Sequence, residues 1–257
     1  MTAPLLEASD LCLRAGERTL VHGLSFGVHA GEVWCMLGRN GAGKSTFLHT
    51  AVGLRMPQRG TLRLAGRALN EWPVAEAARQ RAFLPQSIHD AFSASVLETV
   101  LVGRHPHLSR WQWEGEDDRR IAQAALAAVD LSGFDERDVL TLSGGERQRV
   151  ALAALLVQDT PLLLLDEPVN HLDLHHQLMV LEHLVKLARE RGKGILFTAH
   201  DLNIAARYAG HAVLLSPGGS TQQGKIGEVM TETALSQAFG HRVNRVQALG
   251  CTLFVPQ

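Results

Sequence analysis

Nine consecutive residues near the start of the chain have the types and spacing of a phosphate-binding loop. They are Gly38, Arg39, Asn40, Gly41, Ala42, Gly43, Lys44, Ser45 and Thr46. Glycines let backbone N–H groups surround the β- and γ-phosphates, Lys44 adds a positive charge, and the Ser45 hydroxyl can bind Mg²⁺. A glycine-rich turn could match by chance, but an apolar run, 33–37, precedes the loop and a helical pattern follows it. The sequence therefore predicts a nucleotide site with a helix beginning at Lys44.

Two acids follow a second apolar run. Residues 162–165 are four leucines, and Asp166 and Glu167 come directly after them. Ligands of parallel α/β sheets bind at the carboxyl ends of the strands, so both carboxylates are expected at that edge. Asp166 suits Mg²⁺, directly or through water, and Glu167 can accept a proton from an attacking water. Alone, the pair could equally be a solvated strand end, but beside a phosphate loop that alternative is weak.

A third candidate site is the start of a predicted helix. Ser143, Gly144, Gly145 and Glu146 precede a long apolar pattern. Ser143 is a good N-cap, and the helix N-terminus offers N–H groups and a positive dipole to a second anion. An ordinary capped helix accounts for Ser143 but not for the two glycines.

The composition limits the class of protein. The 257 residues are 46% hydrophobic and 20% charged, with a net charge of −1, which is typical of a globular chain with a sizeable core. The chain lacks the basic surface that a nucleic-acid partner would need. Three scattered cysteines favour a reducing compartment over a disulfide framework. We find no secretion signal and no apolar run of membrane-spanning length, so the chain itself is not expected to cross a membrane.

Apolar runs interleaved with helical patterns predict a parallel α/β sheet. Strands are expected at 5–14, 19–29, 61–65, 82–86, 162–165, 195–198 and 212–215. Between 95 and 158 the spacing is helical, apart from a polar loop at 111–118, which predicts an inserted helical segment. Two helix faces are predicted, one from Ile121, Ala125, Leu126 and Val129, the other from Leu174, Leu178, Leu181, Val185 and Ala188.

The three motifs, with Gln86, Asp173 and His200 in the same order, resemble the ATP-binding subunit of an ABC transporter. The resemblance extends to about Leu235. It implies an α/β P-loop NTPase fold with a mostly parallel RecA-like core sheet, an antiparallel β subdomain and an inserted α-helical subdomain. Within a single ABC ATPase domain, 1–257, the catalytic core would be 1–90 and 159–226, the helical subdomain about 91–158 and the C-terminal tail 227–257.

The resemblance also implies residue roles, with ATP and Mg²⁺ as ligands. Glu167, His200, Gln86 and Lys44 would be catalytic, and Ser45, Gln86 and Asp166 would bind the metal ion. The nucleotide would be bound by residues 38–46 of one chain and by Ser143, Gly144, Gly145 and Glu146 of another. A head-to-tail homodimer would therefore hold two ATP molecules, with Asp173 at the dimer seam.

Three stretches resemble the importers for iron chelates, haem and cobalamin, namely 81–86, 102–107 and 200–208. We expect haem as the cargo, with cobalamin or a ferric siderophore as alternatives. The subunit would lie on the cytoplasmic face of the inner membrane, bound to a separate permease that receives cargo from a periplasmic or surface binding protein. An exporter subunit and a soluble non-transport ABC ATPase are the rival interpretations.

The chain departs from the family pattern at several positions. Arg14 and Ala15 stand where relatives place an aromatic residue, so we expect weak base discrimination, with Arg14 lying over the adenine ring. Arg39 replaces the usual proline of the phosphate loop, and we expect it to be exposed and the change to be harmless. Four histidines, His105, His107, His175 and His176, could form a metal site. We do not expect one, because no carboxylate or cysteine completes a set of metal ligands.

Overall fold

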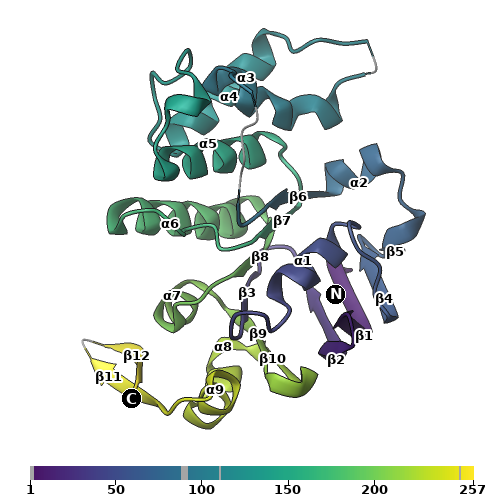
Figure 1. The fold of residues 1–257 in the computed structure, drawn as a ribbon. Helices are drawn as coiled ribbons and strands as arrows, with labels where there is room; N and C mark the ends of the chain where they lie inside the picture. The colour runs from purple at the N-terminus through teal and green to yellow at the C-terminus, as the bar shows by residue number, and fades with distance from the viewer. Residues whose placement is uncertain (1–2, 88–91, 110, 249) are drawn as a thin grey trace.

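A six-stranded sheet forms the centre of the computed structural model, which describes residues 3–87, 92–109, 111–248 and 250–257 (Figure 1). The strand order is β10-β9-β3-β8-β7-β6. The strands are β3 (Val33–Leu37), β6 (Arg81–Leu84), β7 (Leu162–Leu165), β8 (Gly194–Thr198), β9 (His211–Leu215) and β10 (Thr221–Lys225). Neighbouring strands are parallel except for β10, which pairs antiparallel with β9 at one edge. The predicted parallel α/β sheet is thus confirmed.

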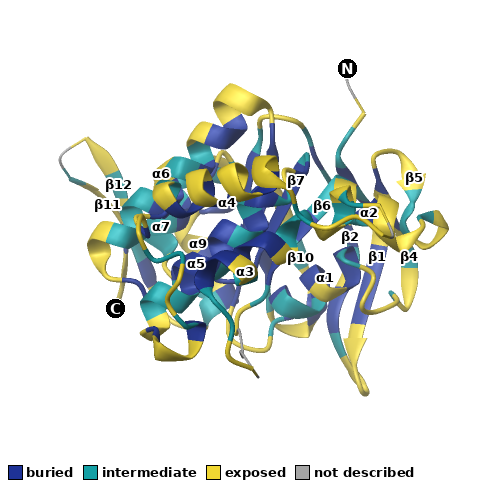
Figure 2. Ribbon diagram, turned by 90° about the horizontal axis from the view of Figure 1, so that it is seen from above, coloured by how far each residue is buried: buried dark blue, intermediate teal, exposed yellow. Residues whose placement is uncertain are grey.

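The central strands β3, β7 and β8 are buried at every position because both faces of the sheet are covered. Side chains alternate between two clusters: Cys35 and Leu163 pack in one, and Trp34 and Leu164 pack in the other. Figure 2 shows the strands buried beneath helices whose outer faces are exposed. The carboxyl ends of β3, β6, β7 and β8 are consequently fixed relative to one another.

Two smaller sheets flank the centre. An antiparallel sheet of order β2-β1-β4-β5 contains β1 (Leu6–Ala15), β2 (Arg18–Val28), β4 (Arg59–Leu64) and β5 (Arg67–Ala68). At the other side of Figure 1, the C-terminal strands β11 (Val243–Ala248) and β12 (Cys251–Pro256) form a hairpin. The sequence itself predicts strands in this tail at 242–246 and 252–255, and the hairpin agrees with that prediction.

Helices fill the connections. They are α1 (Lys44–Ala51), η1 (Leu69–Glu71), α2 (Val74–Gln80), α6 (Leu174–Arg191), α7 (Leu202–Tyr208), η4 (Pro217–Gly219), α8 (Ile226–Val229) and α9 (Glu232–Phe239). The segment between β6 and β7 contributes α3 (Val96–Leu101), η2 (Val102–His107), α4 (Glu116–Ala128), η3 (Val139–Thr141) and α5 (Gly144–Val157). No helix in the described part of the chain is long and apolar enough to cross a membrane.

The helical segment is held together by a charged pair that is largely buried. Arg104 Nε donates to Asp118 Oδ1 at 2.8 Å, and its Nη1 donates to the Val157 carbonyl at 2.8 Å. Asp118 Oδ2 accepts from the Gly115 N–H at the start of α4. The hydrogen bond from Arg104 is the main reason that the pKa of Asp118 lies below its usual value. This pair joins η2, α4 and the end of α5.

Three predictions of helix faces and bounds were wrong in part. Ile121 and Leu174 are 40% and 71% exposed, although the 3.6-residue spacing assigned them to buried faces. In α6 the buried positions include Leu184 and Leu187, outside the predicted stripe. Helix α4 begins at Glu116, inside the predicted loop. Spacing alone does not show which part of an apolar face meets the neighbouring element.

Candidate active site

The phosphate-binding loop joins the end of β3 to the start of α1, as predicted. Its backbone is one that only glycine adopts easily. Gly38 has φ 151°, and a Cβ there would lie 2.8 Å from the Leu215 carbonyl oxygen. Gly43 has φ 113° at the N-cap of α1, and a Cβ there would lie 3.0 Å from Leu20 Cβ. The glycines therefore allow the loop to curl against β2 and β9.

Lys44 is buried at the base of this loop. Its Nζ donates to the Gly38 carbonyl at 2.9 Å and lies 3.4 Å from the Arg39 carbonyl. Burial lowers the pKa of Lys44, whereas the Glu167 and Asp166 carboxylates act to raise it. The structure thus brings the loop lysine within electrostatic range of both acids.

The two acids follow β7 and are almost fully buried, at 1% exposure for Asp166 and 5% for Glu167. Thr198, at the end of β8, connects them. Its Oγ1 donates to Asp166 Oδ1 at 2.7 Å and accepts from the Glu167 N–H at 2.8 Å. Glu167 has φ 52°, a left-handed conformation that is costly for a residue with a side chain. Such strain persists where the surroundings fix a functional geometry.

Three side chains surround the Glu167 carboxylate. Gln86, just beyond β6, donates from Nε2 to Glu167 Oε2 at 3.0 Å, and Asn170 donates to the same oxygen. His200 Nε2 lies against Glu167 Oε1. Residues from three strand ends therefore meet at one carboxylate, which leaves it held by donors in a site shielded from bulk water. A phosphate loop beside such a carboxylate defines a nucleotide hydrolase of the P-loop class.

The same geometry fits a hard cation. With Gln86 Nε2 directed at Glu167, the amide oxygen of Gln86 remains an available acceptor. Ser45 and Asp166, the other two residues predicted to bind the metal ion, also carry side-chain oxygen atoms, the kind of ligand that Mg²⁺ prefers. Among the described residues, no group of three histidines, cysteines or acids could hold a metal ion by itself.

Ser143 is the N-cap of α5, as predicted. Its Oγ accepts from the Glu146 N–H at 3.3 Å, and its N–H donates to Glu146 Oε2 at 2.8 Å. The hydrogen bond from the Ser143 N–H lowers the pKa of Glu146, so the Glu146 carboxylate is part of the helix cap. Gly144 and Gly145 begin the helix, and their N–H groups have no partner within it. Ser143 and Glu146 have the Ser-x-x-Glu spacing that signals a capping box, although the prediction above used only Ser143.

Asp173 is the N-cap of α6. Its Oδ1 accepts from the His176 N–H at 3.0 Å, and its Oδ2 lies 2.8 Å from His176 Nδ1. The hydrogen bond from the His176 backbone lowers the pKa of Asp173. His176 Nε2 also lies 3.5 Å from Asp130 at the end of α4. Two of the four histidines considered for a metal site are thus a neighbouring pair at a helix start.

Sequence reasoning missed Thr198 and Asn170. Both lie within three residues of a recognised motif, but neither spacing nor residue type predicts their contacts with the two acids. Arg14, expected to lie over the adenine ring, donates to the Glu17 carbonyl at 2.6 Å across the β1–β2 turn. Arg39 is exposed, as expected, and its guanidinium reaches the end of α9 at Gly240.

Comparison with known proteins identifies the family. A family model described as ABC transporter matches residues 21–170. The hemin import ATP-binding protein HmuV of Gloeobacter violaceus is 43% identical over 98% of this chain and 94% of its own length. The iron(3+)-hydroxamate import ATP-binding protein FhuC of Bacillus subtilis is 38% identical over 91% of this chain and 87% of its own. An inward-facing structure of a metal-chelate type ABC transporter matches with a TM-score of 0.86 and 28% identity, covering 99% of this chain and 98% of the other.

The chain therefore belongs to the ABC transporter family, and it is an ATP-binding, ATP-hydrolysing member of that family. The predicted resemblance and the predicted ATPase activity are both confirmed.

Proposed function

We propose that this chain is the ATPase subunit of an importer for a metal chelate, with haem as the cargo. The similarity to a hemin import ATP-binding protein over nearly the whole chain supports the haem assignment. A ferric siderophore is the second candidate, because the hydroxamate-import relative is 38% identical. Cobalamin rests on the local sequence resemblance alone.

The observation that carries the proposed mechanism is the Glu167 carboxylate, buried and held by Gln86, Asn170 and His200. Glu167 takes a proton from the attacking water, and His200 and Gln86 orient that water at the γ-phosphate. Lys44 and the N–H groups of residues 38–46 hold the phosphates. Mg²⁺, bound by Ser45, Asp166 and Gln86, would neutralise charge on the phosphate oxygens. We assign Asn170 to the same site as a donor that orients Glu167.

A homodimer completes the site in this proposal. The N–H groups of Gly144 and Gly145, at the start of α5, form a second anion site with Ser143, and Glu146 supports it by holding that end of the helix through the capping box. In a head-to-tail dimer this surface of one protomer covers the nucleotide on the other, and Asp173 lies at the seam. Closure would therefore require ATP, and hydrolysis would release it.

A separate permease is the proposed membrane partner. Exposed Leu54, Met56 and Val74 border a hollow of about 450 Å³ between the end of α1 and α2. Phe92 is also exposed, six residues beyond Gln86, while residues 88–91 lie outside the described residues. Apolar surface of this kind suits a short permease helix. The subunit would then be peripheral on the cytoplasmic face of the inner membrane, served indirectly by a periplasmic or surface binding protein.

The division into parts belongs to the same proposal. The catalytic core would be 1–90 and 159–226, with the helical subdomain at about 91–158 moving against it when ATP binds. Arg79 Nε in α2 donates to the Pro106 carbonyl at 2.5 Å, and Gln158 donates to the Ala78 carbonyl at 2.5 Å. These bonds would transmit motion between the two parts.

The test is ATPase activity of the subunit reconstituted with its permease and binding protein in lipid vesicles. Haem bound to the binding protein should stimulate phosphate release, and ferric hydroxamates and cobalamin should not. If phosphate release is stimulated by a ferric siderophore and not by haem, the cargo is a ferric siderophore. If the subunit hydrolyses ATP but fails to co-purify with any permease from solubilised membranes, the transport role is refuted.

A further inference from the structure

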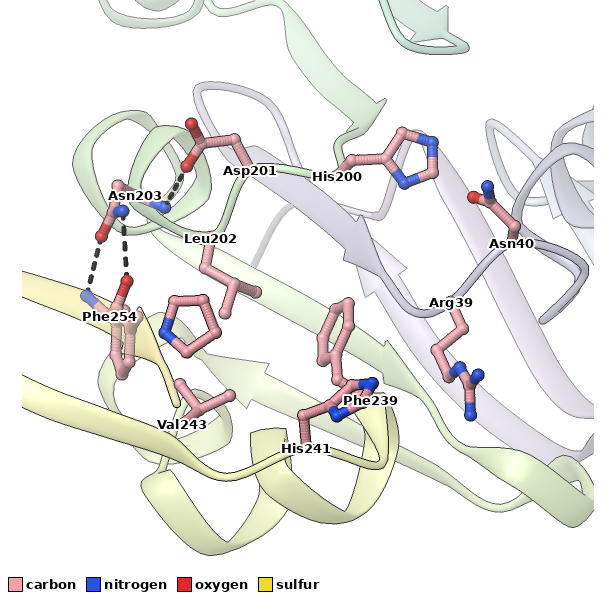
Figure 3. Close-up of a pocket in the computed structure, with 11 residues that line it drawn as sticks. Arg39, Asn40, His200, Asp201, Leu202, Asn203, Phe239, His241, Val243 and Phe254 are labelled. Carbon is pink, nitrogen blue, oxygen red and sulfur yellow. Dashed lines mark hydrogen bonds between the residues drawn. The ribbon is translucent and has the colours of Figure 1, made fainter.

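The C-terminal hairpin, β11 with β12, is fastened to the helix that follows His200. The Phe254 N–H in β12 donates to Asn203 Oδ1 at 2.8 Å, and Asn203 Nδ2 lies 3.3 Å from the Phe254 carbonyl oxygen. Figure 3 shows both bonds. One side chain thus pairs with both backbone groups of one residue, as a neighbouring strand would. Phe254 is itself 4% exposed and packs in the main hydrophobic cluster, so the attachment point is fixed.

The attachment lies close to His200 along the chain. Asp201 caps α7, accepting from the Asn203 N–H at 2.7 Å and the Ile204 N–H at 3.3 Å. The backbone from His200 to Asn203 is therefore a tight turn rather than a free linker. Holding Asn203 consequently limits where the His200 Cα can lie.

His200 needs such support from its backbone. Its side chain is 40% exposed, and Glu167 is the one polar partner recorded for it among the described residues. A cavity of about 580 Å³ lies beside it, with Arg39, Asn40 and His200 on one wall and Val243 and Phe254 on the other (Figure 3). The imidazole therefore has space to turn away from Glu167 unless α7 fixes its origin.

The C-terminal segment reaches the phosphate loop as well. Gly240 ends α9 with φ 71°, and Arg39 Nη1 lies 3.1 Å from the place that a Cβ would occupy on it. A cation at a helix C-terminus interacts favourably with the carbonyl end of the dipole. The tail thus borders both loops that face the γ-phosphate position.

We propose that the C-terminal hairpin is a brace for the hydrolytic site and that Asn203 is a positioning residue that holds His200 against Glu167. This rests on the proposed role of His200 in hydrolysis. The tail of the chain then takes part in ATP turnover, although it contributes no group to the reaction. Binding of ATP, which depends on residues 38–46, does not involve the brace.

The test is Asn203→Leu, which keeps the size of the side chain and removes both hydrogen bonds. We expect kcat for ATP in the reconstituted transporter to fall by about 10- to 100-fold, since small misplacements of reacting groups cost this much. KM for ATP should stay within about twofold, because the phosphate loop is untouched. Asn203→Asp keeps the acceptor for the Phe254 N–H and should retain an intermediate kcat.

The matched control is Gln247→Leu. Gln247 makes a side-chain bond within the same hairpin, to Thr252 Oγ1 at 2.8 Å, but it faces solvent. This variant should behave as wild type. If Gln247→Leu slows turnover as much as Asn203→Leu, the effect is a general loss of the hairpin and the proposal fails.

A double-mutant cycle separates this inference from the proposed function. If Asn203 acts through His200, then Asn203→Leu should change kcat little in a His200→Ala background. Multiplicative losses would contradict the inference. Near-normal turnover in His200→Ala alone would instead refute the role of His200. If His200→Ala turns over ATP slowly while Asn203→Leu turns it over at the normal rate, the brace is refuted and the catalytic assignment of His200 stands. Retained ATP binding verifies that each variant is folded.

Discussion

Glu167→Gln is the substitution that removes the proposed base with the least change in shape. The amide oxygen of glutamine can take the place of Oε2 and still accept from Gln86 and Asn170. Its NH₂ group then faces His200 Nε2, which accepts when the imidazole proton is on Nδ1. Every recorded contact of the side chain has a replacement, so we expect the variant to fold and to bind ATP.

The expected loss of rate follows from the role of the carboxylate. A positioned general base contributes about 10²- to 10⁴-fold to a rate. At about 1.4 kcal/mol for each factor of ten, the barrier should rise by about 3–5.5 kcal/mol. Since three side chains hold the carboxylate in one orientation, we expect the upper part of this range.

Two measurements check this prediction. Phosphate release by the reconstituted transporter should fall by the stated factor, while filter binding should show that ATP is retained at wild-type affinity. Glu98→Gln is the matched control, because Glu98 is also a glutamate whose carboxylate accepts hydrogen bonds, here from Ser95 in the capping box of α3, but it lies at an exposed position outside the site. Phosphate release within about threefold of wild type in Glu167→Gln would refute the assignment of the base.

Three further predictions follow from other parts of the structure. Lys44→Met should leave the unliganded protein at least as stable as wild type, because burial lowers the pKa of Lys44 and disfavours its charge. The rise in melting temperature that ATP causes in the wild type should vanish in this variant. A rise that persists would contradict the role of Lys44 in ATP binding. Asp118→Asn should cost about 1.5–3 kcal/mol in urea unfolding at neutral pH. Because the folded-state pKa of Asp118 is lowered, the carboxylate stabilises the protein above its unfolded pKa, and that contribution disappears as pH falls through the folded value. The variant should therefore lose less stability between pH 5 and about pH 2 than wild type does; an equal acid loss would contradict the pairing. With Ala15 in place of an aromatic, ATP should be preferred over GTP by less than about tenfold in competitive binding, and a larger ratio would refute weak base discrimination.

The local motifs were predictable because each is specified by a short stretch of sequence. The leucines of β7 followed by Asp166 and Glu167 determine a buried strand with acids at its end. The phosphate loop needs glycine at fixed positions, and Gly38 and Gly43 have the positive φ values that explain this. The order of strands and helices followed from the same apolar runs.

Two contacts at and beside the site were not predictable, because they join residues far apart in sequence. Thr198 contacts both acids only because β8 lies beside β7 in the sheet. Asn203 pairs with Phe254, fifty-one residues away, through a tail for which sequence analysis gave no function. The predicted burial of Ile121 and Leu174 was wrong for a related reason. Whether an apolar residue is buried depends on the element that packs against it, which helical spacing does not identify.

The central claim is that each hydrolytic site is divided between two copies of the chain. The direct test combines Lys44→Ala in one copy with Ser143→Arg in the other, each with its own affinity tag, and isolates the heterodimeric transporter. Each variant alone should be inactive. In the heterodimer one site receives both defects and the other receives none, so ATPase activity should return to as much as about half of wild type. A heterodimer as inactive as the two parents would show that each site lies within one protomer, which would contradict the account.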